Sequence, residues 1–206
     1  MAFLKTGLGT ELNPPIRGHG VWLRQPLAID YVPWAELRAM SREHLRPWEP
    51  QWARDELTRS AYRRRLRHYA REAREGVGYA YFIFRADDER LLGGLTLSNV
   101  RRGVSQSASL GYWLGEPYVR RGYMSAAVEA IARFGFEDLD LHRIEAACLP
   151  VNEASIRVLE RCGFRREGLA RRYLKINGEW QDHLLYARLD EDAGRDSGIT
   201  EASQTG

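Results

Sequence analysis

The 206-residue chain is poor in cysteine and has no long apolar run, and each shortage excludes a class of protein. Its two cysteines, Cys148 and Cys162, fall in a predicted strand and at a predicted helix end, which fits neither a disulfide framework nor a set of metal ligands. No window approaches the roughly 20 apolar residues of a membrane-spanning helix. Residues 1–7 lack the apolar core of a signal peptide. We therefore expect a cytoplasmic protein that holds no metal and does not associate with a membrane.

Lysine is scarce as well: Lys5 and Lys175 are the only lysines, so 29 of the 31 basic residues are arginines. The net charge of +3 is too small to indicate a DNA-binding protein. Arginines are densest over 63–67, but Glu72 and Glu75 dilute the charge of the same predicted helix. We expect a solvated helix face there, with contact to RNA or to an acidic partner as the alternative.

A hydrophobic content of 44% is enough for one core, and no linker divides the chain. Residues 1–19 are rich in glycine and proline, and residues 190–206 are polar. We therefore expect a flexible segment at each end of a single domain over 20–189.

Hydrophobic periodicity and turn residues predict alternating strands and helices. Strands are predicted over 21–25, 79–85, 91–98, 109–114 and 143–148, with a last pair around the turn Asn177-Gly178. Helices are predicted over 33–44, 55–75, 125–139 and 152–162, while the two prolines of 44–50 predict an irregular loop. This order indicates an α/β protein of the α+β kind, with a mixed sheet and helices on its faces.

The stretch 117–128 combines a basic, glycine-containing turn with the start of a predicted helix. Backbone N–H groups from Arg121 to Ala126 lack partners at such a helix start and carry the positive end of the helix dipole. Arg120 and Arg121 add charge, and Gly122 permits a positive φ and close approach of a ligand. The pattern predicts a phosphate-binding turn, with an ordinary basic loop as the alternative.

Several segments together resemble the GNAT acetyltransferases, and within them the RimJ/RimL-type protein N-terminal acetyltransferases, most of all the RimJ branch. These segments are 110–114, 121–124, 142–146, 150–155, 162–168 and 173–183, and the resemblance covers about 20–189. It implies the GNAT fold: a mostly antiparallel central sheet with one splayed strand pair and helices on both faces. The turn departs from the usual family pattern at Val119 and Met124, and the methionine is similar to the RimJ branch.

The resemblance implies that acetyl-CoA is the co-substrate, with its pyrophosphate on the turn and its pantetheine arm along the splayed strand. The residues implied to bind it are Tyr112, Trp113, Leu114, Arg120, Arg121, Gly122, Tyr123, Met124, Ser125, Ala126, Asn152 and Ser155. For Asn152 and Ser155, a helix cap with its neighbouring serine is the alternative interpretation.

The resemblance also implies that Ser155 lies near the thioester sulfur and protonates the departing thiolate. A backbone N–H near 110–112 is placed to stabilise the oxyanion. Many family members carry a glutamate as base where this chain reads Ser107-Ala108-Ser109-Leu110. The alternatives near the family's motifs are Glu167, Tyr173, Asp182 and His183, each of which could act through a bridging water. For Glu167 and Asp182, a structural hydrogen bond or a surface ion pair is an equally good interpretation. Neither cysteine is expected to act as a nucleophile.

Acceptor recognition is assigned to the aromatic loop from Leu45 to Trp52 and to the last hairpin, with Leu45, Trp48 and Trp180 as the binding residues. The resemblance implies acetyl transfer to a primary amine in a ternary complex, most of all to the N-terminal alanine of a ribosomal protein. A small amine such as a polyamine or an antibiotic is the second substrate class. A non-catalytic acyl-CoA-binding or ribosome-assembly module is the third reading. Either a monomer or a homodimer fits.

Overall fold

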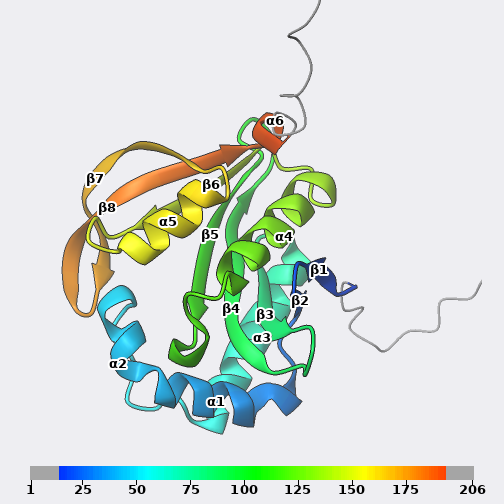
Figure 1. Ribbon diagram of the computed structural model, residues 1–206, viewed down its shortest axis with the longest axis vertical. Helices are drawn as coiled ribbons and strands as arrows, with labels where there is room; N and C mark the ends of the chain where they lie inside the picture. The colour runs from blue at the N-terminus through cyan, green and yellow to red at the C-terminus, as the bar shows by residue number, and fades with distance from the viewer. Residues whose placement is uncertain (1–13, 194–206) are drawn as a thin grey trace, which may run out of the picture.

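An eight-stranded sheet forms the centre of the computed structural model, which describes residues 14–193. The strands lie in the order β1-β2-β3-β4-β5-β6-β8-β7, and every neighbouring pair is antiparallel except β5 and β6 (Figure 1). Their bounds are β1 Ile16–Gly18, β2 Val21–Arg24, β3 Tyr79–Arg85, β4 Leu91–Arg101, β5 Ser107–Leu114, β6 Arg143–Cys148, β7 Arg165–Ile176 and β8 Glu179–Leu189. The predicted mixed sheet is confirmed.

Helices cover both faces of this sheet. α4 (Tyr123–Glu137) and α5 (Glu153–Arg161) lie in front of it in Figure 1, and α3 (Arg59–Glu75) lies behind it. α1 (Tyr31–Met40) and α2 (Arg42–Leu45) close one end, and the four-residue α6 (Asp190–Ala193) follows β8. Short 3-10 turns at Ala28–Asp30, Arg46–Trp48 and Glu116–Tyr118 complete the elements.

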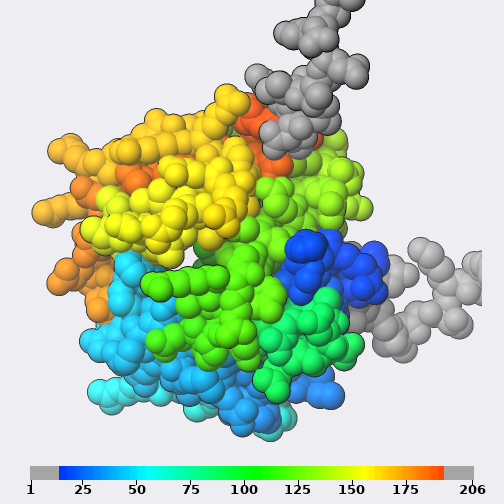
Figure 2. All heavy atoms as spheres, in the orientation of Figure 1, coloured from blue at the N-terminus to red at the C-terminus, as the bar shows by residue number. Residues whose placement is uncertain are grey.

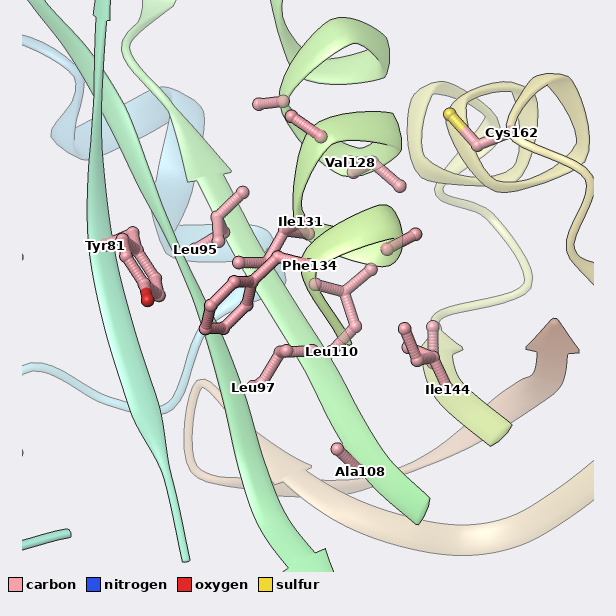
Figure 3. Packing of buried hydrophobic residues seen from close by; sticks show 14 of the residues in the cluster. Tyr81, Leu95, Leu97, Ala108, Leu110, Val128, Ile131, Phe134, Ile144 and Cys162 are labelled. Carbon is pink, nitrogen blue, oxygen red and sulfur yellow. The ribbon is translucent and has the colours of Figure 1, made fainter. Parts of the chain in front are cut away.

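The larger core lies between α4, α5 and the sheet. Ile131 and Phe134 of α4 point at apolar side chains of the strands, among them Leu97 and Leu110, and Val128 is buried in the same core (Figure 3). A β-carbon built at Gly135 would lie 2.9 Å from Ile144 Cδ1, so the glycine permits the close approach of helix and sheet. The smaller core lies on the opposite face, where α1 and α3 pack Trp34, Leu37 and Tyr62 against Phe82 and Phe84.

Local turn chemistry sets the ends of several elements as predicted. Asn152 caps α5, because its Oδ1 accepts the N–H of Ser155 at 3.0 Å. Gly76 ends α3 with a φ of 69°. Asn177 and Gly178 both have positive φ, which is the backbone of a two-residue hairpin turn. The start of α3 differs from the prediction: Thr58 caps the helix by accepting the N–H of Ala61, so α3 begins at Arg59, four positions after the predicted start at 55.

Three predictions need correction. The helix predicted over 33–44 is two helices, because the chain turns at buried Ser41, whose Oγ accepts the N–H of Glu116 at 2.9 Å. The predicted loop 44–50 contains a 3-10 turn at Arg46–Trp48, which Pro47 permits because the first residues of a helix need no N–H partner. The predicted flexible segment 1–19 contains β1, which pairs with β2; residues 1–13 lie outside the described part.

At the other end, residues 190–193 of the predicted tail form α6, and residues 194–206 lie outside the described part. Within residues 14–193, no helix combines the length and the apolar character needed to cross a membrane.

Candidate active site

The site begins where β5 and β6 separate. The two strands pair from Ser107 with Arg143 to Leu110 with Ala146, and their register ends there. β5 continues to Leu114 and stays paired with β4 on its other side. From Gly111 onward, one edge of β5 therefore offers its backbone N–H and C=O groups to a ligand, in the way that an added strand would use them.

A cavity of about 490 Å³ lies in this gap on the side of α4 and α5, and we call it the α4-side cavity. Figure 2 shows the hollow between α5 in yellow, α2 in light blue and the green segment before α4. Seven of the predicted acetyl-CoA residues line it: Tyr112, Trp113, Leu114, Arg120, Met124, Asn152 and Ser155. The other five, Arg121, Gly122, Tyr123, Ser125 and Ala126, form the start of α4 beside Arg120 and Met124.

The start of α4 has the geometry of an anion site. The Ala126 N–H donates to Gly122 O at 3.0 Å, and the preceding N–H groups of residues 123–125 have no intrahelical acceptor. Gly122 has a φ of 80°, and Arg120 also lies in the left-handed region with a φ of 61°. A β-carbon at Gly122 would meet nothing within 4 Å, so the glycine is needed for its φ and not for space. The positive φ of Arg120 was not anticipated from the sequence.

Ser155 and Tyr112 meet inside the α4-side cavity. The two hydroxyl oxygens lie 2.7 Å apart, and burial raises the pKa of Tyr112, so its hydroxyl keeps its proton. The Asn152 side chain uses its Oδ1 for the cap, which leaves its NH2 group available to a ligand. The cap and the ligand-binding role of Asn152 are therefore compatible.

Both cysteines are free and buried. Cys148 lines the α4-side cavity, and burial raises the pKa of its thiol. Burial likewise raises the pKa of Cys162 to about 12. Two neutral thiols agree with the expectation that neither cysteine attacks the substrate.

The proposed bases are not brought together. His183 is 2% exposed and lines the α4-side cavity, with Nδ1 3.0 Å from the carbonyl oxygen of Gln181. Because a carbonyl only accepts, Nδ1 donates there, and in the neutral ring Nε2 is the free acceptor. Tyr173 packs edge-on against the His183 ring at 5.9 Å but does not line the cavity.

Glu167 and Asp182, the other two candidates, both lie outside the α4-side cavity, and each has another partner. Glu167 is held by Arg143, at 2.9 Å on one oxygen, and this guanidinium lowers the pKa of Glu167. Asp182 accepts the N–H of Arg172 at 2.8 Å.

A second cavity, of about 410 Å³, lies on the opposite face of β5, and we call it the α3-side cavity. Its walls come from α1, α3, the segment after Trp48, and strands β3 to β5. It shares Glu49, Pro50, Gly111, Tyr112 and Trp113 with the α4-side cavity. The two cavities therefore meet where β5 leaves β6.

Two arginine–glutamate pairs line the α3-side cavity. Arg38 makes two parallel hydrogen bonds to Glu49, and Arg65 pairs with Glu56. Sequence reasoning missed Arg38, which lies on an otherwise ordinary predicted helix. Glu49 falls within the loop predicted to contact the acceptor, but nothing in the sequence around it indicates that it pairs with Arg38.

The predicted acceptor residues are divided between two places. Leu45 and Trp48 line the α4-side cavity. Trp180 is 61% exposed and lines a third hollow, of about 680 Å³, together with Trp48. Among residues 14–193, no three His, Cys, Asp or Glu side chains are grouped to hold a metal ion.

Comparison with known proteins agrees with this geometry. Residues 21–165 match the model of the acetyltransferase (GNAT) domain family. The probable N-acetyltransferase YjcK of Bacillus subtilis is 35% identical over 86% of this chain and 98% of its own length. The [ribosomal protein uS5]-alanine N-acetyltransferase of Escherichia coli is 34% identical over 77% of this chain and 81% of its own.

Two solved structures share the fold. Ribosomal-protein-S5-alanine acetyltransferase from Vibrio fischeri superposes with a TM-score of 0.81 at 30% identity, covering 87% of this chain and 98% of the other. Mycobacterium smegmatis RimJ in complex with CoA-disulfide superposes with a TM-score of 0.80 at 32% identity, covering 93% of this chain and 91% of the other. The predicted family and fold are confirmed: the chain belongs to the GNAT acetyltransferases and is an N-acetyltransferase that uses acetyl-CoA.

Proposed function

We propose that the chain acetylates the N-terminal alanine of a ribosomal protein by direct attack in a ternary complex. The observation that carries this proposal is the meeting of two cavities at Gly111–Trp113. Direct transfer requires both substrates at one point, and cavities on opposite faces of β5 let them arrive without displacing each other. Similarity to enzymes named for ribosomal-protein alanine supports this acceptor. Such a substrate is made in the cytoplasm, so we place the activity there.

The α4-side cavity fits acetyl-CoA, which supplies the acetyl thioester when bound. The free N–H groups at the start of α4 and the Arg120 side chain fit its phosphates. The open edge of β5 from Gly111 fits the amide groups of its pantetheine arm. We assign the oxyanion to a backbone N–H of the same edge.

Ser155 is the proton donor to the departing sulfur in this proposal. Its Oγ lies 2.7 Å from the hydroxyl of Tyr112, which keeps its own proton and so can donate to Ser155. The Ser155 O–H is thereby left to donate into the cavity.

The demand for a base is small for an α-amino acceptor. Its ordinary pKa is about 7.7 to 8.0, so a substantial fraction is uncharged near neutral pH. Of the bases named from the sequence, His183 is the one that lines the α4-side cavity. We assign it the role of accepting, through water, the proton that leaves the amine.

The test follows the release of free thiol from acetyl-CoA. A short alanine-terminated peptide is compared with the same peptide carrying a blocked amino terminus, and with a polyamine. We expect thiol release with the free peptide and none with the blocked one. Release with the polyamine alone would overturn the peptide acceptor, and binding of CoA without any release would overturn catalysis.

A further inference from the structure

Glu49 stands where the two cavities meet. Two acidic residues line these cavities, Glu49 and Glu56, and Glu49 alone lines both. It therefore offers a carboxylate at the junction, although the β5 segment Ser107–Leu110 lacks the glutamate that many family members carry. Its backbone is fixed as well, because its carbonyl oxygen accepts the N–H of Asn177 at 2.9 Å.

Three donors hold the Glu49 carboxylate in one orientation. Arg38 Nη1 lies 2.6 Å from Oε1, and Arg38 Nη2 lies 2.7 Å from Oε2. Trp52 Nε1 lies 2.7 Å from Oε2. Arg38 is itself 6% exposed, with its guanidinium 4.3 Å from the Trp52 ring centre and 4.9 Å from that of Trp113. These three hydrogen bonds, two of them from a guanidinium, leave the Glu49 carboxylate little freedom to rotate.

The two oxygens of Glu49 differ in what they have left to accept. Oε2 takes two hydrogen bonds, while Oε1 takes one, from Arg38. Since a carboxylate oxygen has two acceptor sites, Oε1 retains one. The ligand that suits it is a hydrogen-bond donor with positive charge.

We propose that Oε1 of Glu49 binds the primary amino group of the acceptor where the two cavities meet. The inference rests on the proposed function and names the residue that positions its substrate. Glu49 receives the ammonium form and keeps a hydrogen bond to the amine after one proton has left to water. Because the amine then stays beside Gly111 and Tyr112, its lone pair is held near the open edge of β5.

Other charged or titratable groups also line the two cavities. They are Arg38 on α1, His44 on α2, Glu56 before α3, Arg65 and Tyr69 on α3, Tyr81 on β3, Tyr112 on β5, Arg120 before α4, Cys148 on β6, Lys175 on β7 and His183 on β8. All of them are unchanged in Glu49→Gln, so the ratio of its KM to that of the wild type at each pH isolates Glu49.

The test uses Glu49→Gln and the double variant Arg38→Met/Glu49→Gln. The double variant removes both charges, so that no unpaired buried charge remains to unfold the protein. Calorimetry on CoA-saturated protein measures binding of an alanine-terminated peptide, and the KM for the peptide is followed from about pH 6.5 to about pH 9. Melting temperature and acetyl-CoA affinity are measured alongside.

We expect both variants to bind the peptide about tenfold more weakly at neutral pH, equivalent to about 1.4 kcal/mol, with acetyl-CoA affinity within about twofold of wild type. The difference in KM between wild type and variant should shrink as pH rises through about 8, because only the ammonium form is attracted by the charge. Unchanged peptide affinity in the double variant would overturn the proposal, and so would a KM ratio that is constant with pH.

The matched control is the pair formed by Arg24 and Asp30. Arg24 donates to both oxygens of Asp30, each at 2.6 Å, and Leu27 N–H supplies a third donor at 2.7 Å. Asp30 is 4% exposed, the Arg24 guanidinium lies 4.4 Å from the Phe84 ring centre, and neither partner lines either cavity. Asp30→Asn and Arg24→Met/Asp30→Asn should lower the melting temperature without weakening peptide binding. Equal weakening there would overturn the assignment to Glu49.

The two proposals fail in different ways. If wild-type protein releases no thiol with any amine, the proposed function fails, and the binding measurement still reports on Glu49. If wild type acetylates the peptide while the Glu49 variants bind it normally, the positioning role alone fails.

Discussion

The α4-side and α3-side cavities lie on the two faces of one strand, yet they are built differently. The α4-side cavity draws its predicted ligand groups from three short stretches, 111–114, 120–126 and 152–155. Most of these groups are backbone N–H and C=O. The α3-side cavity is lined by side chains that α1, α3 and the segment 49–52 contribute from distant parts of the chain. Recognition by backbone leaves a contiguous pattern in a sequence, whereas recognition by assembled side chains does not.

The largest expected effect tests whether the chemistry lies on the α4 side of β5. Ser155→Ala removes the proton donor assigned to the leaving sulfur, so kcat should fall about 100-fold, which is within the range of general acid catalysis. Acetyl-CoA affinity should stay within about twofold, because the Asn152 cap uses the backbone N–H of Ser155. Steady-state kinetics and equilibrium binding check this. The control is Ser98→Ala, which removes a hydroxyl that donates to Ser109 O, and its kcat should stay at the wild-type value. An unchanged kcat would remove Ser155 from the mechanism.

A smaller effect tests the backbone character of the same cavity. Gly122→Ala places a β-carbon at a φ of 80°, which costs about 1 to 2 kcal/mol and shifts the free N–H groups of α4. We expect acetyl-CoA affinity to fall about tenfold, measured by calorimetry.

Gly103→Ala is a matched control, because Gly103 has a φ of 68° and also has nothing within 4 Å of a built β-carbon. Both variants should lose similar stability in urea, and Gly122→Ala alone should lose affinity. Equal affinity in the two would show that the turn does not bind the phosphates through its backbone.

The same contrast explains which parts of the fold could be predicted. The Asn152 cap, the Gly76 helix end and the Asn177-Gly178 turn depend on a few adjacent residues, and all three are confirmed. The break at Ser41 depends on a hydrogen bond to Glu116, which is 75 positions away in the chain. A three-residue strand such as β1 is too short to show a hydrophobic period. Its partners, β2 and α4, lie elsewhere in the chain.

The site divides in the same way. The turn around Gly122 and the pair Asn152 and Ser155 could be proposed from the sequence because each is a short contiguous motif. Arg38 was missed because nothing in its own helix distinguishes it from a surface arginine, and its role comes from Glu49 and Trp52. Glu167 was proposed as a base because it lies next to a family motif in the sequence. Its position on β7 places its carboxylate beside Arg143 and outside the α4-side cavity.

A still smaller effect separates the two roles of Asn152. Asn152→Ala removes both the cap and the NH2 group, and should cost about 1 kcal/mol of stability. Asn152→Asp keeps the cap but loses the NH2 donor. If that donor binds acetyl-CoA, affinity should fall about fivefold in both variants, the value of one hydrogen bond, while the melting temperature falls only in the alanine variant. If Asn152→Asp binds acetyl-CoA with wild-type affinity, Asn152 acts only as the helix cap.

The smallest expected effect lies outside both cavities. Glu167→Gln should leave kcat and both KM values within about twofold, because this carboxylate is held by Arg143 away from the junction.

Arg143 lowers the pKa of Glu167, so the ion pair stabilises the fold above the unfolded pKa of about 4.3. This contribution is lost as pH falls through the lower folded pKa. Since the pair is exposed, the variant should be less stable by under about 1 kcal/mol at neutral pH, and the difference should vanish in acid. Urea titrations at several pH values measure it. A large loss of kcat with unchanged stability would instead restore Glu167 as a base and place the chemistry outside both cavities.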